Sequence, residues 1–410
     1  MQADELAGQP IGARIQVIRE RQGKTRTVVA GLVGRSPQWL KDVERGRRLP
    51  PRWDMLVRLA QVLHVDVTAL TGDAGGVTAP VSLQRREGHP VVTALREAIE
   101  DPVLQPPDSP DPDVASLVQR AEHAWRLWHR SAEPRAATGT VLPRLIREAR
   151  QATRMTGGKE RRMAHAVLVS AYALCEQALA WVADPALLWL VADRCMHHAQ
   201  EADQPELMAA AAWVLGNVWR ASGREEDAYR LALQAARTLQ PYLADGSTDS
   251  RALWGSVQLH AAITAARMGE EGNALRALDQ GIEMAQKIPS GQVHPWTLFG
   301  VENALLTGVS VHVDMCKSAT ALERADAIDP DTVPSIDRRA RLWLEMARSY
   351  HQKKDTLAAL QTLQRATDVS EESMRCHPLS RGIAGELVVS GGKLVEREAR
   401  RLATRLGLTV

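Results

Sequence analysis

The segment 34–46, GRSPQWLKDVERG, concentrates polar side chains whose hydrogen-bonding groups match the edges of DNA bases. A glutamine donates and accepts at once and so suits adenine, a lysine donates to guanine, and an aspartate accepts from the cytosine amino group. All three types occur close together here, at Gln38, Lys41 and Asp42. The segment therefore has the composition of a DNA recognition helix, although the same side chains would also suit a solvated helix face.

Local signals predict that this segment is a short helix. Ser36 can cap the first turn, Pro37 falls at N1, where no backbone donor is lost, and Gly46 ends the helix. Leu40 and Val43 are three residues apart and would face a core. The residues left pointing outward are Gln38, Lys41, Asp42 and Arg45.

The flanking sequence predicts a compact five-helix bundle that would position this helix. Apolar residues recur at helical spacing in the ranges 11–22, 26–33, 53–63 and 66–70. Two short helices joined by a tight glycine-containing turn are the helix-turn-helix signature. Residues 11–72 include twelve basic and five acidic side chains, a net charge of +7, whereas the rest of the chain carries −5. A basic head on an acidic body suits a head that meets a polyanion.

The string RIQVIRERQGKTRTVVAGLVGRSPQWLKDVERGRRLPPRWDMLVRLAQVLHVDVTALTG resembles the Cro/phage-repressor (XRE) family of DNA-binding domains. The resemblance lies in the RER-x-G turn, the T-x3-[VL]-A block, the VERG end of the recognition helix, the RRLP turn and the LVRLAQVL helix. It implies that Gln38, Lys41 and Asp42 face base edges, and that Arg19 and Glu44 form an inter-helix ion pair. It also implies a set of phosphate contacts, from Arg26, Arg35, Arg45, Arg47 and Arg48.

Three residues depart from the family pattern. Arg26 stands where the family often has glutamine, and Pro37 and Trp39 replace polar residues at the helix start. The family's base preference therefore does not transfer to this chain. Trp39 either packs on the sugar–phosphate backbone or covers the core of its own domain.

Length and composition predict an all-α protein of more than one domain. The chain has 410 residues, in which Ala, Leu, Arg and Glu recur at helical spacing. Four scattered cysteines without CxxC spacing predict neither a zinc site nor a disulfide framework. With no signal peptide and no apolar run of ~18 residues, we expect a cytoplasmic protein that has no membrane partner. No cofactor and no metal are expected.

Proline- and glycine-rich stretches set the expected domain boundaries. The helix-turn-helix domain is expected at 1–72, a linker with one short helix at 73–113, and a helical repeat domain at 114–410. In the last of these, one stretch follows the tetratricopeptide (TPR) pattern through Trp343, Met346, Ala347, Tyr350, Ala359, Leu363 and Ala366. Another follows it through Leu215, Gly216, Trp219, Ala228, Ala232 and Ala235. With three weaker copies, the sequence predicts a TPR-like α-solenoid of about five helix pairs.

A solenoid of helix pairs has a concave face that can hold peptides, partner helices or small ligands. The candidate effector-binding residues are Trp181, Trp213, Asn217, Trp219, Arg220, Trp254 and His260. The tryptophans could instead be core residues, because the repeat pattern itself requires bulky side chains. His197 and His198 are adjacent and diverge by about 100° on a helix, so they do not predict a metal site.

The range 379–410 is predicted to be an amphipathic helix that either caps the last repeat or makes a dimer contact. The order of head and repeats resembles the XRE–TPR regulators of actinomycetes and, more distantly, the peptide-sensing quorum regulators of Gram-positive bacteria. The resemblance implies that the repeats dimerise and bind an effector.

These observations favour a ligand-responsive transcription regulator. It would be a homodimer on a palindromic operator in double-stranded DNA, with a small-molecule or peptide effector in the repeats. The alternative is a protein-interaction adaptor whose head is vestigial or only holds the complex on DNA. An enzyme is not expected, because the chain has no glycine-rich phosphate loop, no HExxH and no GxSxG motif.

Overall fold

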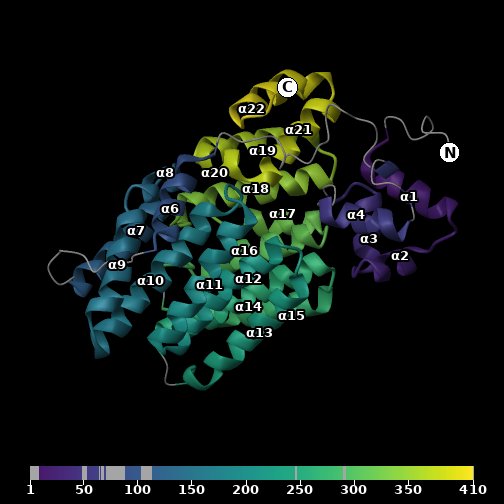
Figure 1. The fold of residues 1–410 in the computed structure, drawn as a ribbon. Coiled ribbons are helices and arrows are strands. Elements are labelled where there is room, and N and C mark those ends of the chain that lie inside the picture. The colour runs from purple at the N-terminus through teal and green to yellow at the C-terminus, as the bar shows by residue number, and fades with distance from the viewer. Residues whose placement is uncertain are drawn as a thin grey trace.

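A computed structural model describes residues 9–48, 53–63, 65, 69–70, 88–102, 113–244, 247–289 and 292–409. Those residues form helices and turns with no strand among them, so the all-α prediction is confirmed (Figure 1). The helices form a small N-terminal head and a long body that is solenoid-like. No helix in the described ranges is long and apolar enough to cross a membrane.

The head contains four described helices around one apolar core. They are α1 (Ile11–Arg21), α2 (Arg26–Leu32), α3 (Pro37–Glu44) and α4 (Trp53–Val62). Ile15, Val29, Leu40 and Leu59 are fully buried at the centre, which is the inward face that the helical spacing predicted. Most of the fifth helix expected at 66–70 lies outside the described residues, of which 69–70 are helical.

Most of the linker expected at 73–113 lies outside the described residues. The body begins with four helices, α6 to α9, that pack on the long helix α10. Its helices are α6 (Pro90–Glu100), α7 (Val114–Arg130), α8 (Pro134–Gly139), α9 (Leu142–Met155), α10 (Gly158–Leu179), α11 (Pro185–Ala202), α12 (Pro205–Ala221), α13 (Glu225–Leu239), α14 (Thr248–Met268), α15 (Glu271–Ala285), α16 (Val301–Asp314), α17 (Ser318–Asp326), α18 (Ile336–Gln352), α19 (Thr356–Val369), α20 (Glu371–Cys376), α21 (Pro378–Ser390) and α22 (Lys393–Arg405).

Five consecutive helix pairs, from α10/α11 to α18/α19, stack on one another and build the body. Even-numbered helices contact each other in series, so α10, α12, α14, α16 and α18 form one layer of the stack. Small residues allow this close approach. A Cβ at Gly216 would lie 2.8 Å from Nε2 of His260, so α12 and α14 can pack at this distance only with glycine there.

The two ends of the stack meet, because helices near its start pack against helices near its end. The Ser370 hydroxyl donates to the Ala132 carbonyl oxygen at 2.6 Å. The Glu372 carboxylate accepts from the backbone N–H groups of Arg135 and Ala136 at 2.7 and 2.9 Å, at the N-terminus of α8. Figure 1 shows α8 beside α20. The body is therefore closed on itself.

The C-terminal region differs from the single helix expected at 379–410. It forms α21 and α22, and the chain turns between them at Gly391 and Gly392. Gly392 has φ of +78°, a left-handed conformation that interrupts a helix and that glycine adopts readily. Apolar residues of α22, including Ala399 and Leu402, pack with α19 and α21. The two helices therefore cap the last helix pair, which is one of the two roles that the sequence predicts for this region.

Candidate DNA-binding site

The sequence of α3 accounts for its position in the head. The Ser36 hydroxyl accepts a hydrogen bond from the Trp39 N–H at 3.1 Å, and Pro37 occupies the first turn, as predicted. Thr25 caps α2 in the same way by accepting from the Val28 N–H. The turn between the two helices contains Gly34 with φ of +70°. These local features produce the helix-turn-helix geometry.

A buried ion pair fixes α3 to α1. The Arg19 guanidinium donates from Nε to Oε1 of Glu44 at 2.5 Å and from Nη2 to Oε2 at 3.1 Å, so the pair expected from the family resemblance is present. Arg26 of α2 also donates to Glu44, at 2.5 Å. This candidate phosphate contact is therefore engaged inside the head, and one carboxylate holds three helices together.

The three candidate base-reading residues have different environments. Gln38 is exposed and Lys41 is half-buried, whereas Asp42 is only 1% exposed. Gln38 Nε2 donates to Oδ1 of Asp42 at 3.0 Å, and Arg47 forms an ion pair with the same carboxylate. The expectation that Asp42 points outward is wrong, because neighbouring side chains and the body enclose it.

The body lies against the recognition helix. Figure 1 shows the head beside α15 and α17, and the contacts include Ser36 and Trp39 against Gly269 at the end of α14. The thiol of Cys316 faces Asp42 from the body. Burial raises the pKa of this thiol to about 11, with a further contribution from the Asp42 carboxylate. Trp39 is 8% exposed and belongs to the core of the head. Of the two roles considered for it, it therefore covers the core of its own domain.

Two of the candidate phosphate-binding arginines are bonded to the body. The Arg35 guanidinium donates to Oε1 of Glu225 at 3.0 Å, and both side chains are largely buried, at 12% and 14% exposure. Arg48 donates to the Ala266 carbonyl oxygen at 3.4 Å and to the Asp314 carbonyl oxygen. Of the five arginines only Arg45 is exposed, and the others are half-buried.

The partners of Arg48 are carbonyl oxygens at two helix C-termini. Ala266 and Asp314 lie in the last turns of α14 and α16, where the helix dipole places partial negative charge on the carbonyl groups. The Asp314 carboxylate adds a full charge. Burial by itself would raise the pKa of Asp314, but Arg348, Arg267 and Arg48 hold it well below its usual range. Arg48 is thus held by carbonyl acceptors of the body, beside a carboxylate that is itself ion-paired with Arg267 and Arg348.

Three of the candidate effector-binding residues are brought together between α12 and α14. Arg220 donates to Oδ1 of Asn217 at 2.8 Å and contacts Nε2 of His260 at 3.3 Å. Asn217 in turn donates to Glu176 at 3.3 Å. Burial raises the pKa of Glu176 to about 7 and lowers that of Arg220 to about 9. Glu176 and Thr264 belong to this cluster but were not singled out from the sequence.

The candidate tryptophans do not form one aromatic wall. Trp213 and Trp254 contribute to an apolar core, and the ring of Trp219 lies under the guanidinium of Arg224 at 4.4 Å. Trp181 is elsewhere, with its ring centroid 4.2 Å from that of His377. In the described parts of the chain, no group of three His, Cys, Asp or Glu side chains is placed to hold a metal ion. None of the four cysteines forms a disulfide bond.

Comparison with known proteins identifies the head. Residues 10–71 match the family model described as a helix-turn-helix domain. No curated protein matches the chain. Among solved structures, the apo form of the competence regulator ComR from Streptococcus vestibularis aligns over 97% of this chain and 98% of its own, with 14% identity and a TM-score of 0.31. A score this low carries no functional weight. The N-terminal part of this protein is a helix-turn-helix domain.

Proposed function

We propose that this protein is a sequence-specific DNA-binding transcription regulator. The observation that carries the proposal is α3: a capped helix in a helix-turn-helix domain, with Gln38 exposed and Lys41 half-exposed on one side and Leu40 and Val43 anchoring the other. We assign the head to the XRE type and the stacked pairs to the TPR type, on the sequence patterns that both share with those families. The net charge of +7 on residues 11–72 supports a polyanionic partner.

In the structure the head is packed against the body, which we call the closed conformation. DNA binding requires an open conformation, in which the head has separated from the body. Asp42 is buried, and Arg35 and Arg48 are bonded to Glu225 and to carbonyl groups of the body. The ends of α14 and α16 contact the cap of α3 and Arg48, so a duplex bound by these groups would meet the body. The head must therefore leave the body before α3 can enter a major groove.

An effector would act by binding the open form better than the closed form, because a ligand shifts an equilibrium only by its differential affinity. The polar cluster of Glu176, Asn217, Arg220 and His260 is a candidate for its contacts, since α14 links that cluster to Ala266 beside the head. We infer a homodimer with a palindromic operator, because one small head makes too few contacts for high operator affinity.

The test is selection of genomic DNA fragments by the full-length protein, followed by footprinting of the enriched fragments at physiological salt. We expect a protected palindrome with half-sites about one helical turn apart. The double variant Gln38→Ala and Lys41→Ala should lose sequence preference but keep its folding and its oligomeric state. The proposal is contradicted if no sequence is enriched by the native protein and none is enriched by a variant in which the head has separated from the body.

The adaptor alternative makes a different prediction for the same double variant. A protein that uses its head only to hold a complex would keep that complex when Gln38 and Lys41 are replaced, and its DNA selection would show no shared motif. The two outcomes are distinguished by the motif found in the selected fragments.

A further inference from the structure

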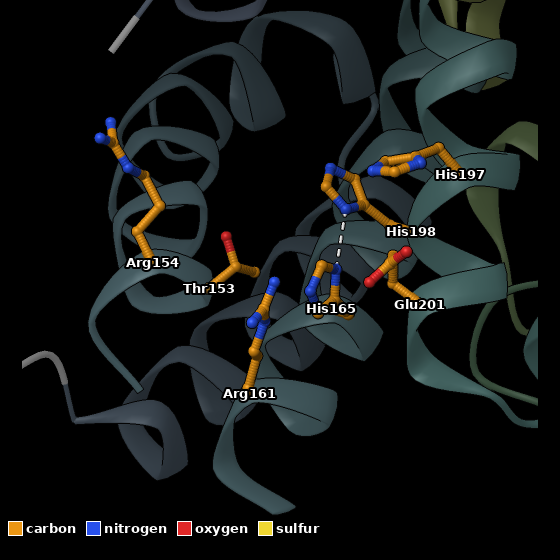
Figure 2. A pocket seen from close by; sticks show the side chains of 7 residues that line it. All are labelled: Thr153, Arg154, Arg161, His165, His197, His198 and Glu201. Atoms are coloured by element: carbon orange, nitrogen blue, oxygen red, sulfur yellow. Dashed lines mark hydrogen bonds between the residues drawn. The ribbon is translucent and has the colours of Figure 1, made fainter. Parts of the chain in front are cut away.

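A separate cavity lies among α9, α10 and α11. Figure 1 shows these helices on the side of the body away from the head. Its volume is about 490 Å³. Figure 2 shows Arg154 and Arg161 on one side of it, and His165, His198 and Glu201 on the other. These side chains come from the last turn of α9, the first two turns of α10 and the C-terminal half of α11. The DNA-binding proposal uses none of them.

Two neutral imidazoles form the inner wall. Nδ1 of His165 lies 3.0 Å from Nδ1 of His198 (Figure 2). The His198 ring also stacks on Tyr172, with centroids 5.7 Å apart. Burial lowers the pKa of His198 to about 3 and that of His165 below its usual value, so neither ring is charged near neutral pH. The Nδ1 to Nδ1 hydrogen bond then requires that one ring carries its proton on Nδ1 and the other on Nε2.

This arrangement leaves one buried polar atom without a partner. His165 is 4% exposed, and its Nε2 makes no hydrogen bond. If His198 donates the shared hydrogen bond, His165 carries its proton on Nε2 and becomes a donor. Figure 2 shows this ring edge turned to the side on which Arg161 lies. Buried polar groups in folded proteins are normally paired, so this atom indicates a missing acceptor.

The first turn of α10 supplies positive charge, one turn before His165 on the same helix. Arg161 is exposed, and within the described residues it makes no hydrogen bond or ion pair. A guanidinium recognises the oxygens of carboxylates and phosphates in a two-pronged geometry. Glu201 lies across the cavity and can accept only, so it would face a donor group of the ligand.

We propose that this cavity binds a small organic anion. Its carboxylate or phosphate group would lie between the Arg161 guanidinium and Nε2–H of His165, and its amino or hydroxyl group would point to Glu201. Binding would select the tautomer in which His198 donates to His165, because only that tautomer offers the Nε2–H donor to the anion.

The test is isothermal titration of the full-length protein, without DNA, with two probes at constant ionic strength. O-Phosphoethanolamine carries a phosphate and an ammonium group but no carboxylate, and L-glutamate carries carboxylates and an ammonium group but no phosphate, so the two probes distinguish a phosphate from a carboxylate ligand. We expect saturable 1:1 binding of at least one probe. Arg161→Gln should weaken it by about ten-fold or more, since a charge-assisted contact is lost. Arg162→Gln, an exposed neighbour that does not line the cavity, is the matched control and should change it by less than about two-fold.

A second measurement reports on the histidines. In ¹⁵N spectra of the imidazole nitrogens, recorded at a probe concentration near the dissociation constant of the native protein, the probe should shift the His165 and His198 signals of the native protein and of Arg162→Gln, and should shift those of Arg161→Gln much less. The proposal is overturned if neither probe binds at about 10 mM, or if both arginine variants weaken binding equally. Because no DNA is present, either result leaves the regulator proposal unaffected.

Discussion

The ion pair between Arg35 and Glu225 offers the sharpest test of the closed conformation. Glu225 belongs to the body, so the substitution Glu225→Gln leaves every side chain of the head intact. The two side chains are 3.0 Å apart and largely buried, and the second oxygen of Glu225 has no other partner. Losing one such contact weakens the association of the head with the body by about 1 to 2 kcal/mol. The population of the open conformation then rises about five- to thirty-fold.

The apparent affinity for DNA should rise by the same factor, until the open form predominates. A protein whose competent state is a small fraction binds with its intrinsic dissociation constant divided by that fraction. Fluorescence anisotropy on a fragment selected by the full-length protein measures the change. Hydrogen exchange of the α3 amides, measured without DNA, should show a parallel loss of protection.

Glu226→Gln is the matched control. Glu226 is the next residue in the first turn of α13, it is exposed, and its loss changes the net charge and the helix dipole in the same way. Equal increases in DNA affinity for the two variants would show that charge alone was responsible. An open head in Glu225→Gln with unchanged DNA affinity would refute the idea that docking limits DNA binding.

Three further predictions test separate parts of the structure. Gly269→Ala should also separate the head from the body, because the new Cβ would lie 2.3 Å from the Ser36 hydroxyl oxygen that caps α3, and hydrogen exchange of α3 should then be faster. Gly392→Ala is the control, since alanine there has similar left-handed strain but open space around its Cβ. Hydrogen exchange of α3 should be unchanged in this control. Glu44→Gln should destabilise the head by about 3 to 5 kcal/mol because it leaves two guanidinium groups without their buried partner, whereas exposed Glu20→Gln should change the unfolding midpoint little. The pKa of Glu176 is raised from 4.5 to about 7, so the folded state holds its proton more tightly, and raising the pH from 5 to 8 should cost about 2 kcal/mol of stability. Glu176→Gln should remove that part of the pH dependence, and a thermal melt series in which both proteins respond equally to pH would contradict the assignment.

The recognition helix could be predicted from the sequence because its signals are local. Ser36 and Pro37 act on backbone groups within one turn, and the spacing of Leu40 and Val43 sets the face that meets the core. Repeat spacing predicted the stacked pairs because small residues recur where helices cross, as Gly216 does. These features need only a few consecutive residues or a regular period.

The packing of the head against the body could not be predicted from the sequence, because it depends on contacts between residues that are far apart in the chain. Arg35 meets a partner 190 residues away, and Arg48 meets backbone carbonyls 218 and 266 residues away. No periodicity connects such residues, and carbonyl acceptors at a helix end carry no side-chain signature. Asp42 and His165 show the same limit: each belongs to a residue type that is usually solvated, and each is buried because another helix or the whole body packs over it. The sequence by itself determined the helices of the head, the stacked helix pairs of the body and the apolar faces of both, and only the packing of distant helices decided which of the remaining polar groups are free to bind a partner.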